Sequence, residues 1–559
     1  MKIYSVNLKR YVEIEGGETL LAIYGRIRDE FPADFTPICA YVNNKNEDLS
    51  FPVFMPKMVE YLDESTPSGT RVAVRSLCMM LYKAVTELMP GRILRIEHSI
   101  SHGYYCRILD MTSGMPVTLT PMDIMDLENK MHELGAAALP FERKERLTTD
   151  VKELFRKQGL NDKVLLLDSA DELYTVFYTL DGLCDSYYGP LAPDTSYLKV
   201  FSLQPFKQGF LLLGRDPNNP AVPATPLPQE KMYQAFTDYL RFNRIIGVST
   251  VGELNKAVMN KRTADVINVA EAMHDKLLGR ISDEIKRRHD AGGARIVLIS
   301  GPSSSGKTTS TKRLAIQLMT NLIVPKMISL DDYFVDREKT PLDADGEYDY
   351  ESLYALDLER FNSDLSRLLK GEEVNIPTYS FELGKRIDKD KRMRLGAKDV
   401  LLIEGIHGLN EKLTEALPRE KIFKIYVSAL TTLRIDDHNW ISTTDTRLLR
   451  RIVRDAKYRH TTAEETIRRW PSVRRGEEKW IFPFQENADA TFNSSLIYEL
   501  GVMKEFAEPV LRGVHHNVPE YAQATRLLKF LSYFDPISLE WIPSTSLLRE
   551  FLGGSSFKY

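Results

Sequence analysis

The chain has few cysteines and no long apolar run. Its 559 residues include four cysteines, which lie far apart and form no CxxC pair. This pattern favours free thiols in a reducing cytosol and argues against a disulfide-stapled scaffold. The longest apolar stretches, such as VLLLD and VLLIEGI, have the length of a buried strand and are too short to span a bilayer.

The chain also lacks a surplus of positive charge. A formal net charge of −4 gives no overall attraction to nucleic acid, so any polyanion site has to be a local patch. The first residues, MKIYSVNLKRYVEIEGG, alternate apolar and polar side chains and lack the apolar core of a signal peptide. We therefore expect a cytoplasmic protein without membrane partners, folded into several domains.

Changes of pattern along the chain predict an α/β protein with five regions. A hairpin turning at Asn43-Asn44 is expected in the first, strand-rich region, and mixed helices and strands in the second. The proline-rich RDPNNPAVPATPLPQEK ends the second region, and alternating strands and helices farther on predict a doubly wound parallel sheet. The regions are a β-rich domain at 1–62, an α+β domain at 63–220, a helical connector at 221–290, a parallel α/β domain at 291–520 and a C-terminal extension at 521–559.

The strongest motif is GPSSSGKT, residues 301–308, which matches the phosphate-loop pattern G-x-x-x-x-G-K-[ST] in full. Its glycines let main-chain N–H groups point into one concavity at the positive end of the next helix. A strand at 296–299 is expected to enter the loop and a helix at 309–319 to leave it. The motif predicts ATP binding, with the Lys307 ammonium on the outer phosphates and the Thr308 hydroxyl on Mg²⁺. The residues expected to bind ATP are Gly301, Ser303, Ser304, Ser305, Gly306, Lys307, Thr308 and Thr309.

Two carboxylates follow apolar strands. Glu404 ends VLLIE, where a carboxylate in a P-loop enzyme orders Mg²⁺ or its water shell. Asp331, in SLDDYF, is expected at the carboxyl end of a central strand, where it could orient a hydroxyl acceptor and take its proton. Taken alone, each of these residues could be no more than a polar residue at the end of a strand. The phosphate loop favours Glu404 as a metal residue beside Thr308, and Asp331 as the catalytic base.

Six motifs connect the C-terminal half to a known family. They are ISGPSSSGKTT, SLDDYF, EYDYESLYALD, VNIPTYSF, VLLIEGIHGL and DTRLLRRIVRD. In order and approximate spacing this segment resembles the uridine kinase family, within the group that includes phosphoribulokinase and pantothenate kinase. The resemblance implies an ATP- and Mg²⁺-dependent nucleoside kinase of P-loop NTPase type, with Asp331 as its base.

The same resemblance implies residues for the acceptor. Asp349 resembles the carboxylate that holds the ribose hydroxyls, and Tyr379 and Phe381 look like the walls around the base. The chain reads ELGKR after YSF, with no histidine where uridine and cytidine kinases often carry one. Pyrimidine specificity is therefore open, and Arg386 is the remaining candidate to line the base site.

The segment DTRLLRRIVRD resembles the family's lid-bearing helix and places Arg447, Arg450, Arg451 and Arg454 on one helical face. The alternative is a solvated basic face of an amphipathic helix. Since guanidinium groups match the charge of a transferring phosphoryl group, we expect Arg447, Arg451 and Arg454 to face phosphate. In the HTTAEETIRRW that follows, Thr461 or Thr462 is expected to cap a helix.

The front half resembles two other modules. Region 1–62 looks like a TGS domain, and region 63–220 is similar to the editing domain of threonyl-tRNA synthetase, on motifs such as HSISHGYYCRILD and LCDSYYGPLAPD. At that family's HxxxH position the chain has Arg75 and Met79; the cysteine is retained as Cys184, and Leu191 stands where a later histidine is expected. One thiol cannot form a hydrolytic metal site, so we expect a scaffold for RNA, nucleotide or subunit contacts.

Three functions remain open from the sequence. The leading one is transfer of the ATP γ-phosphoryl group to the 5′-hydroxyl of a nucleoside, uridine- or cytidine-like, by a homo-oligomeric enzyme. A second keeps the chemistry and changes the acceptor to a sugar phosphate or a pantothenate-like alcohol. A third is an RNA-associated regulatory protein in which the nucleotide acts as a switch.

Overall fold

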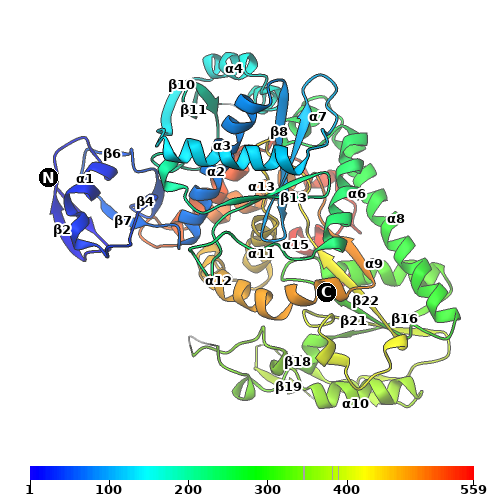
Figure 1. The fold of residues 1–559 in the computed structure, drawn as a ribbon. Helices are drawn as coiled ribbons and strands as arrows, with labels where there is room; N and C mark the ends of the chain where they lie inside the picture. The colour runs from blue at the N-terminus through cyan, green and yellow to red at the C-terminus, as the bar shows by residue number, and fades with distance from the viewer. Residues whose placement is uncertain (171, 344–345, 381, 388, 559) are drawn as a thin grey trace.

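The computed structural model describes residues 1–170, 172–343, 346–380, 382–387 and 389–558. In Figure 1 the N-terminal unit lies at the left and an α+β region at the top. Helices α6 and α8 run down the right side, and the C-terminal α/β region fills the centre and bottom. Within the described part of the chain no helix is long and apolar enough to cross a membrane.

The N-terminal unit is a mixed sheet with one helix. The strand order is β2-β1-β7-β4-β5, and the predicted hairpin joins β4 to β5. Asn43 and Asn44 form its two-residue turn with φ angles of 49° and 58°, as the favoured hairpin turns require. The elements are β1 (Lys2–Ser5), β2 (Arg10–Glu13), β3 (Glu18–Thr19), α1 (Leu20–Ile27), β4 (Cys39–Val42), β5 (Lys45–Glu47), β6 (Pro52–Val53) and β7 (Met58–Leu62).

The second region packs long helices on two antiparallel sheets, ordered β13-β14-β9-β8 and β10-β11-β12. Its central helix α2 starts with Thr66 as N-cap and Pro67 in the first turn, a favoured combination. The elements are α2 (Pro67–Leu88), β8 (Arg92–Ile100), β9 (Gly103–Asp110), α3 (Pro121–Ala136), β10 (Glu142–Leu147), α4 (Thr148–Lys157), α5 (Asn161–Asp168), β11 (Tyr174–Leu180), β12 (Leu183–Asp185), β13 (Ser202–Phe206) and β14 (Gly209–Leu213).

A parallel sheet forms the C-terminal region, as predicted. Its order is β16-β21-β15-β22-β23, and each registered pair is parallel. Strands β15 and β22 are buried on both faces, and most of their side chains are apolar. The elements are α6 (Glu230–Ile246), α7 (Val251–Met259), α8 (Thr263–Asp290), β15 (Ile296–Ser300), α9 (Lys307–Thr320), β16 (Val324–Ser329), α10 (Leu358–Leu369), β17 (Val374–Asn375), β18 (Thr378–Ser380), β19 (Lys385–Ile387), β20 (Arg392–Met393), β21 (Asp399–Glu404), β22 (Ile422–Ser428), α11 (Thr443–Tyr458), α12 (Ala463–Trp480), β23 (Ala490–Asn493), α13 (Glu499–Arg512), α14 (Tyr521–Ser532) and α15 (Arg549–Leu552).

Buried ion pairs join the two halves of the chain. Arg434, in the loop after β22, donates to Glu97 of β8 at 2.8 Å, and neither side chain is more than 4% exposed. In the same loop His438 contacts Asp185 of β12 at 2.7 Å, and that carboxylate raises the pKa of the buried imidazole. Because buried charges are stable only when paired, these contacts fix the α+β region against the parallel-sheet region.

Candidate active site

The phosphate loop joins β15 to α9. Ser304 and Gly306 have φ angles of 57° and 83°, in the left-handed region that favours glycine. A Cβ added to Gly301 would lie 1.9 Å from the carbonyl oxygen of Val427, so only glycine fits there. Helix α9 begins at Lys307, two residues before the predicted start. The N–H groups of its first turn have no intrahelical partner and can therefore bind an anion.

In this structure two carboxylates of the chain accept hydrogen bonds from N–H groups of the phosphate loop and of the first turn of α9. The Ser303 N–H donates to Glu477 Oε1 at 3.0 Å. The Thr309 N–H and hydroxyl donate to Glu550 Oε2, at 3.2 and 2.6 Å. Both acceptors come from segments well after the loop, on α12 and α15. The predicted anion-binding geometry is thus present, with protein carboxylates as the anions.

Lys307 lies among main-chain carbonyls and carboxylates. Its Nζ donates to the carbonyl oxygens of Gly301 and Pro302, at 2.9 and 3.1 Å. Burial lowers the pKa of Lys307, and the charges of Glu404 and Asp331 oppose that change. The ammonium is therefore close enough to both carboxylates to sense their charge, and it can turn toward a phosphate.

Asp331 follows β16 directly, in a short turn in which its N–H donates to the Ser329 hydroxyl at 3.3 Å. The residue is exposed to solvent, yet the surrounding protein raises the pKa of its carboxyl. The positive charge of Lys307 acts in the opposite direction, and the charge of Asp332 adds to the increase. A carboxylate that is reachable and has a raised pKa is suited to accept a proton from a substrate hydroxyl.

Glu404 ends β21, beside both of these groups. The sheet register pairs it with Ile299 before the phosphate loop and with Ser329 before Asp331. Burial raises its pKa to about 7, Asp331 adds to the increase, and a hydrogen bond with the Thr308 hydroxyl opposes it. Sequence reasoning placed Thr308 and Glu404 in one site, and the structure brings them into contact.

Glu351 is an acidic residue of this cluster that sequence reasoning missed. Its Oε2 is buried and has no hydrogen-bond partner among the described residues. Burial and the charge of Glu477 raise the pKa of Glu351 to about 7, while Arg451 and Lys307 lower it. In the sequence, only its position two residues after Asp349, in the motif EYDYES, could have indicated that Glu351 belongs to the site.

Two arginines of α11 are buried against the phosphate loop. Arg447 is 1% exposed and Arg450 is fully buried; they form ion pairs with Glu477 and Glu499. Arg447 Nε donates to the Ser303 carbonyl at 3.0 Å, and Arg450 Nη1 approaches the next carbonyl at 3.4 Å. Arg447 thus contacts both the Ser303 carbonyl and the Glu477 carboxylate that accepts from the Ser303 N–H. That it faces phosphate stays a prediction.

Two other arginines of α11 lie nearer to the acidic cluster. Arg451 Nη1 donates to the Ser303 hydroxyl at 2.9 Å, and Arg451 is close enough to lower the pKa of Glu351. Arg454 pairs with Asp455 at 2.8 Å and lowers the pKa of Asp331. These two are placed to approach a phosphoryl group near Lys307. The helix after them, α12, starts at the predicted cap Thr462.

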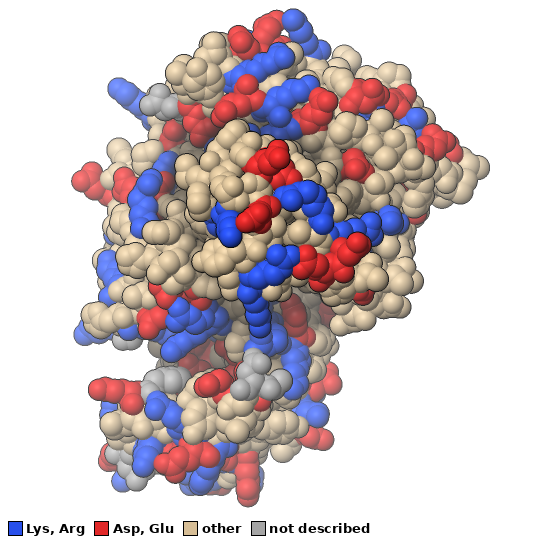
Figure 2. Space-filling view, turned by 90° about the vertical axis from the view of Figure 1, so that its left-hand side faces the viewer, with Lys and Arg blue, Asp and Glu red and all other residues tan. Residues whose placement is uncertain are grey.

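The residues predicted for the acceptor lie beyond Asp331, in the lower lobe with α10, β18 and β19 (Figure 1). The Tyr379 ring lies 5.6 Å from the Phe334 ring, between centroids, and so forms a flat wall. The Asp349 carboxylate accepts from the Glu351 N–H at 3.1 Å. Phe381 lies outside the described residues. Figure 2 shows a recess between this lobe and the main body, with Lys and Arg side chains along its upper rim.

Arg386 is held by the protein. Its guanidinium donates to the Phe334 carbonyl at 3.0 Å and pairs with Asp357 at 2.8 Å. Asp357 is the N-cap of α10, so the pair fixes that helix to the segment after Asp331. In this arrangement Arg386 positions the acceptor wall.

The positions compared with the editing domain are close together and mostly apolar. Arg75 and Met79 are buried on α2, and Leu191 is buried beside the Pro190 carbonyl to which Arg75 donates at 2.9 Å. Cys184 lies on β12, and burial raises the pKa of its thiol. A raised pKa keeps the thiol protonated and unreactive.

Comparison with known proteins gives two different likenesses. Residues 296–497 match the model described as the Phosphoribulokinase / Uridine kinase family. A uridine kinase of Staphylococcus aureus is 29% identical over 195 residues, which are 35% of this chain and 84% of that protein. Residues 296–497 form a phosphoribulokinase/uridine kinase-family domain. The phosphate loop, Asp331 and Glu404 all lie inside this matched segment.

The N-terminal region is similar to segments of threonine–tRNA ligases. The ligase of Citrifermentans bemidjiense is 31% identical over 166 residues, 30% of this chain, and that of Rubrobacter xylanophilus is 27% identical over 251 residues, 43% of this chain. The chain spans 25% and 38% of the length of these two proteins. A solved structure titled as a possible uridine kinase from Bacillus stearothermophilus matches 38% of this chain and all of its own, with 19% identity and a TM-score of 0.25.

Magnesium fits the oxygen donors beside the loop. Among the described residues no group of three His, Cys, Asp or Glu side chains is arranged to hold a metal ion. Mg²⁺, however, commonly uses one or two protein ligands and completes its shell with water and phosphate oxygens. The contact between the Thr308 hydroxyl and Glu404 supplies such a pair.

Proposed function

We propose that the protein is an ATP- and Mg²⁺-dependent nucleoside kinase that forms a nucleoside 5′-monophosphate and ADP. The observation that supports it most is the convergence of Lys307, Asp331 and Glu404 at the carboxyl edge of the parallel sheet. This is the edge at which ligands bind in open α/β sheets. The family match supplies the phosphoryl-transfer chemistry, and the reachable carboxylate of Asp331 supports an alcohol as the acceptor.

The transfer step follows from these positions. The 5′-oxygen of the nucleoside forms a bond to the γ-phosphorus of ATP, the bond from that phosphorus to the bridging oxygen breaks, and ADP leaves. Asp331 receives the proton of the hydroxyl. The loop N–H groups, Lys307 and the guanidinium of Arg451 or Arg454 balance the charge on the phosphoryl oxygens. Thr308 and Glu404 would hold Mg²⁺, which neutralises charge between the β- and γ-phosphates.

ATP binding requires a rearrangement of the resting contacts. The γ- and β-phosphates have to replace Glu477 and Glu550 at the loop N–H groups, and Lys307 has to leave the carbonyl oxygens that it now contacts. Once both carboxylates have moved, the negative charge of the triphosphate no longer meets theirs at the loop. Arg474 also pairs with Glu477 at 3.0 Å and can keep that carboxylate paired after it leaves the loop.

An acceptor panel tests the nucleoside part of the proposal. The full chain is incubated with Mg²⁺–ATP and either uridine, cytidine, adenosine, guanosine, a pentose phosphate or pantothenate, and products are identified by mass spectrometry. A nucleoside 5′-monophosphate is the expected product. Phosphorylation of the sugar phosphate or of pantothenate alone would replace the nucleoside as acceptor. ATP hydrolysis that depends on added RNA and forms no phosphorylated acceptor would favour the regulatory alternative.

A further inference from the structure

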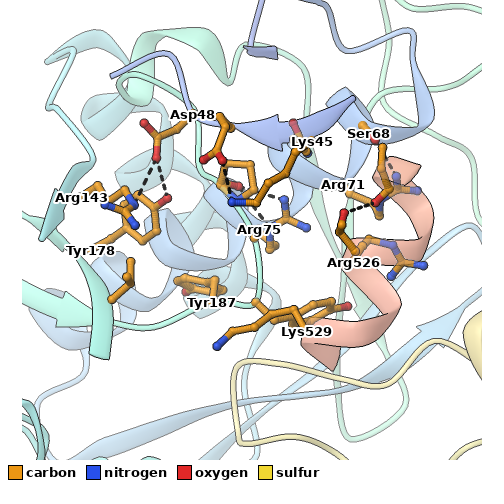
Figure 3. Close-up of a pocket in the computed structure, with 18 residues that line it drawn as sticks. Lys45, Asp48, Ser68, Arg71, Arg75, Arg143, Tyr178, Tyr187, Arg526 and Lys529 are labelled. Carbon is orange, nitrogen blue, oxygen red and sulfur yellow. Dashed lines mark hydrogen bonds and ion pairs between the residues drawn. The ribbon is translucent and has the colours of Figure 1, made fainter. Parts of the chain in front are cut away.

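A second site lies where the N-terminal unit, α2 and α14 meet (Figure 3). It is a cavity of about 280 Å³, and it shares no residue with the phosphate loop or the acidic cluster around Lys307. Six of its lining side chains are cationic and two are acidic. The cations are Lys45, Arg71, Arg75, Arg143, Arg526 and Lys529, and the acids are Glu47 and Asp48.

Four of the six cations have a carboxylate partner. Lys45 pairs with Glu47 at 2.8 Å and Arg526 pairs with Asp445 at 2.5 Å. Arg143 and Lys529 lie within ion-pair distance of one carboxylate each. The charge of these four is therefore largely balanced by the protein itself.

Arg71 and Arg75 are different. They lie one turn apart on α2, and the described part of the chain gives neither of them a carboxylate within 4.0 Å. Arg75 is 4% exposed, and among the described residues its guanidinium donates only to the Pro190 carbonyl, at 2.9 and 3.2 Å. Arg71 donates to the Ser68 hydroxyl at 2.7 Å. Burial and the charge of Arg526 lower the pKa of Arg71 to about 10.

A buried guanidinium such as that of Arg75, with the half-buried Arg71 one turn away and no directly paired carboxylate, is stabilised when an anion accompanies it. Both point into the cavity in Figure 3, next to Arg526. Guanidinium groups bind phosphate oxygens bidentately, and closely spaced arginines match the two negative charges of a phosphate monoester. The charge pattern thus indicates an anion, and the volume of about 280 Å³ suits a small one.

Part of the cavity lining is aromatic. Tyr178 and Tyr187 are 3% and 8% exposed, and the Arg75 guanidinium lies 5.9 Å from the centre of the Tyr188 ring. Flat side chains of this kind bind planar rings. One part of the cavity is therefore suited to a phosphate and another to a heterocyclic base.

We propose that this cavity binds a nucleoside monophosphate, with its phosphate on Arg71 and Arg75 and its base against the tyrosines. A single small ligand agrees with the cavity volume of about 280 Å³. The face in Figure 2, onto which the N-terminal unit projects, shows Lys and Arg interspersed with Asp and Glu, which is not the pattern of an extended polynucleotide track. The site is independent of the proposed kinase activity.

The test measures binding of AMP, GMP, CMP and UMP to the full chain by calorimetry and by thermal denaturation. At least one of the four is expected to bind and to raise the melting temperature. Arg71→Met and Arg75→Met should each weaken that binding at least tenfold, whereas Arg146→Gln, on β10 beside the cavity wall, should leave it unchanged. If none of the four binds, or if they bind both arginine variants as they bind the wild type, the proposal fails.

Two further experiments show whether the nucleotide binds at this cavity or at the phosphate loop, and whether Arg71 has only a structural role. Lys307→Ala should keep the binding; binding lost in Lys307→Ala but kept in the arginine variants belongs to the phosphate loop and overturns the proposal. Since Arg71 is repelled by Arg526, unliganded Arg71→Met should melt at or above the wild-type temperature and lose the nucleotide-induced shift. A lower melting temperature with an unchanged shift would make Arg71 structural only.

Two control ligands test the chemistry of the site. Inorganic phosphate should bind more weakly than the tightest monophosphate, because it cannot contact the tyrosines. Equal affinity would reduce the site to an anion hole and overturn the assignment of a base. Binding of transfer RNA with no binding of any mononucleotide would likewise overturn it.

Discussion

Glu550 lies 241 residues after Thr309, yet its carboxylate accepts hydrogen bonds from both the N–H and the hydroxyl of that residue. Thr309 is in the first turn of α9, where the helix end favours negative charge. Leu547 of the same tail covers Gly306, since a Cβ there would lie 2.7 Å from Leu547. The C-terminal tail thus places an acidic group on the nucleotide-binding loop.

Removal of that carboxylate should strengthen ATP binding. In Glu550→Gln the side chain keeps its size and loses the charge that competes with phosphate at the helix end. Such charges contribute about 0.3–2 kcal/mol, so the Kd for ATP should fall by roughly two- to thirtyfold. Isothermal titration with a non-hydrolysable ATP analogue measures it. Glu540→Gln, elsewhere in the tail, is the matched control, and an unchanged or larger Kd in Glu550→Gln would contradict the competition.

Arg447 should act by positioning the loop. Arg447→Met leaves the buried Glu477 with Arg474 as its remaining cationic partner, so the loss of folding free energy should not exceed about 3–5 kcal/mol, the typical cost of isolating a buried charge. Replacing both, as Arg447→Met with Glu477→Gln, should recover part of that loss because no charge is then isolated. Urea denaturation of the two variants measures the difference. Equal losses of folding free energy in the single and the double variant would show that Arg447 and Glu477 are not energetically coupled.

Glu351 should make stability depend on pH. Its folded pKa is about 7 and its ordinary value is 4.5. Between these values the folded state binds more protons than the unfolded state, so this group makes the free energy of unfolding fall as pH rises from 4.5 to 7. Glu351→Gln should therefore stabilise the protein at pH 8 relative to the wild type, by roughly 3 kcal/mol, and much less at pH 4.5.

Denaturation at both pH values checks this, with Glu347→Gln, an exposed residue of the same segment, as the control. A gain for Glu351→Gln of the same size at both pH values would show that its burial is not the cause.

The docking of the two halves should depend on Glu97. Its side chain is fully buried and pairs with Arg107 and with Arg434. Glu97→Gln removes the carboxylate partner of Arg107 and the nearer of the two carboxylates that pair with Arg434, and should lower the free energy of unfolding by about 3–5 kcal/mol. Glu30→Gln, which breaks the exposed pair with Arg10, should change it by less than about 1 kcal/mol. Comparable losses in the two variants would contradict a buried ionic interface.

The local parts of the site were predictable from the sequence and the long-range parts were not. Gly301 to Thr308 are consecutive, and Asp331 and Glu404 each end an apolar strand, so spacing and strand pattern located them. Glu477 and Glu550 reach the same loop from distant helices, and no local pattern records that contact. Helical spacing placed the arginines of α11 on one face correctly, but it could not show that Arg447 and Arg450 are buried against the loop.

The role of Asp331 is tested most directly by a single-turnover measurement of phosphoryl transfer with Asp331→Asn. The control is Asp332→Asn, whose side chain pairs with Lys391 at 3.1 Å. The account predicts that Asp331→Asn binds ATP as the wild type does and transfers the phosphoryl group at least about a hundredfold more slowly, whereas Asp332→Asn stays within a few-fold of the wild type. Transfer by Asp331→Asn at the wild-type rate would contradict the account.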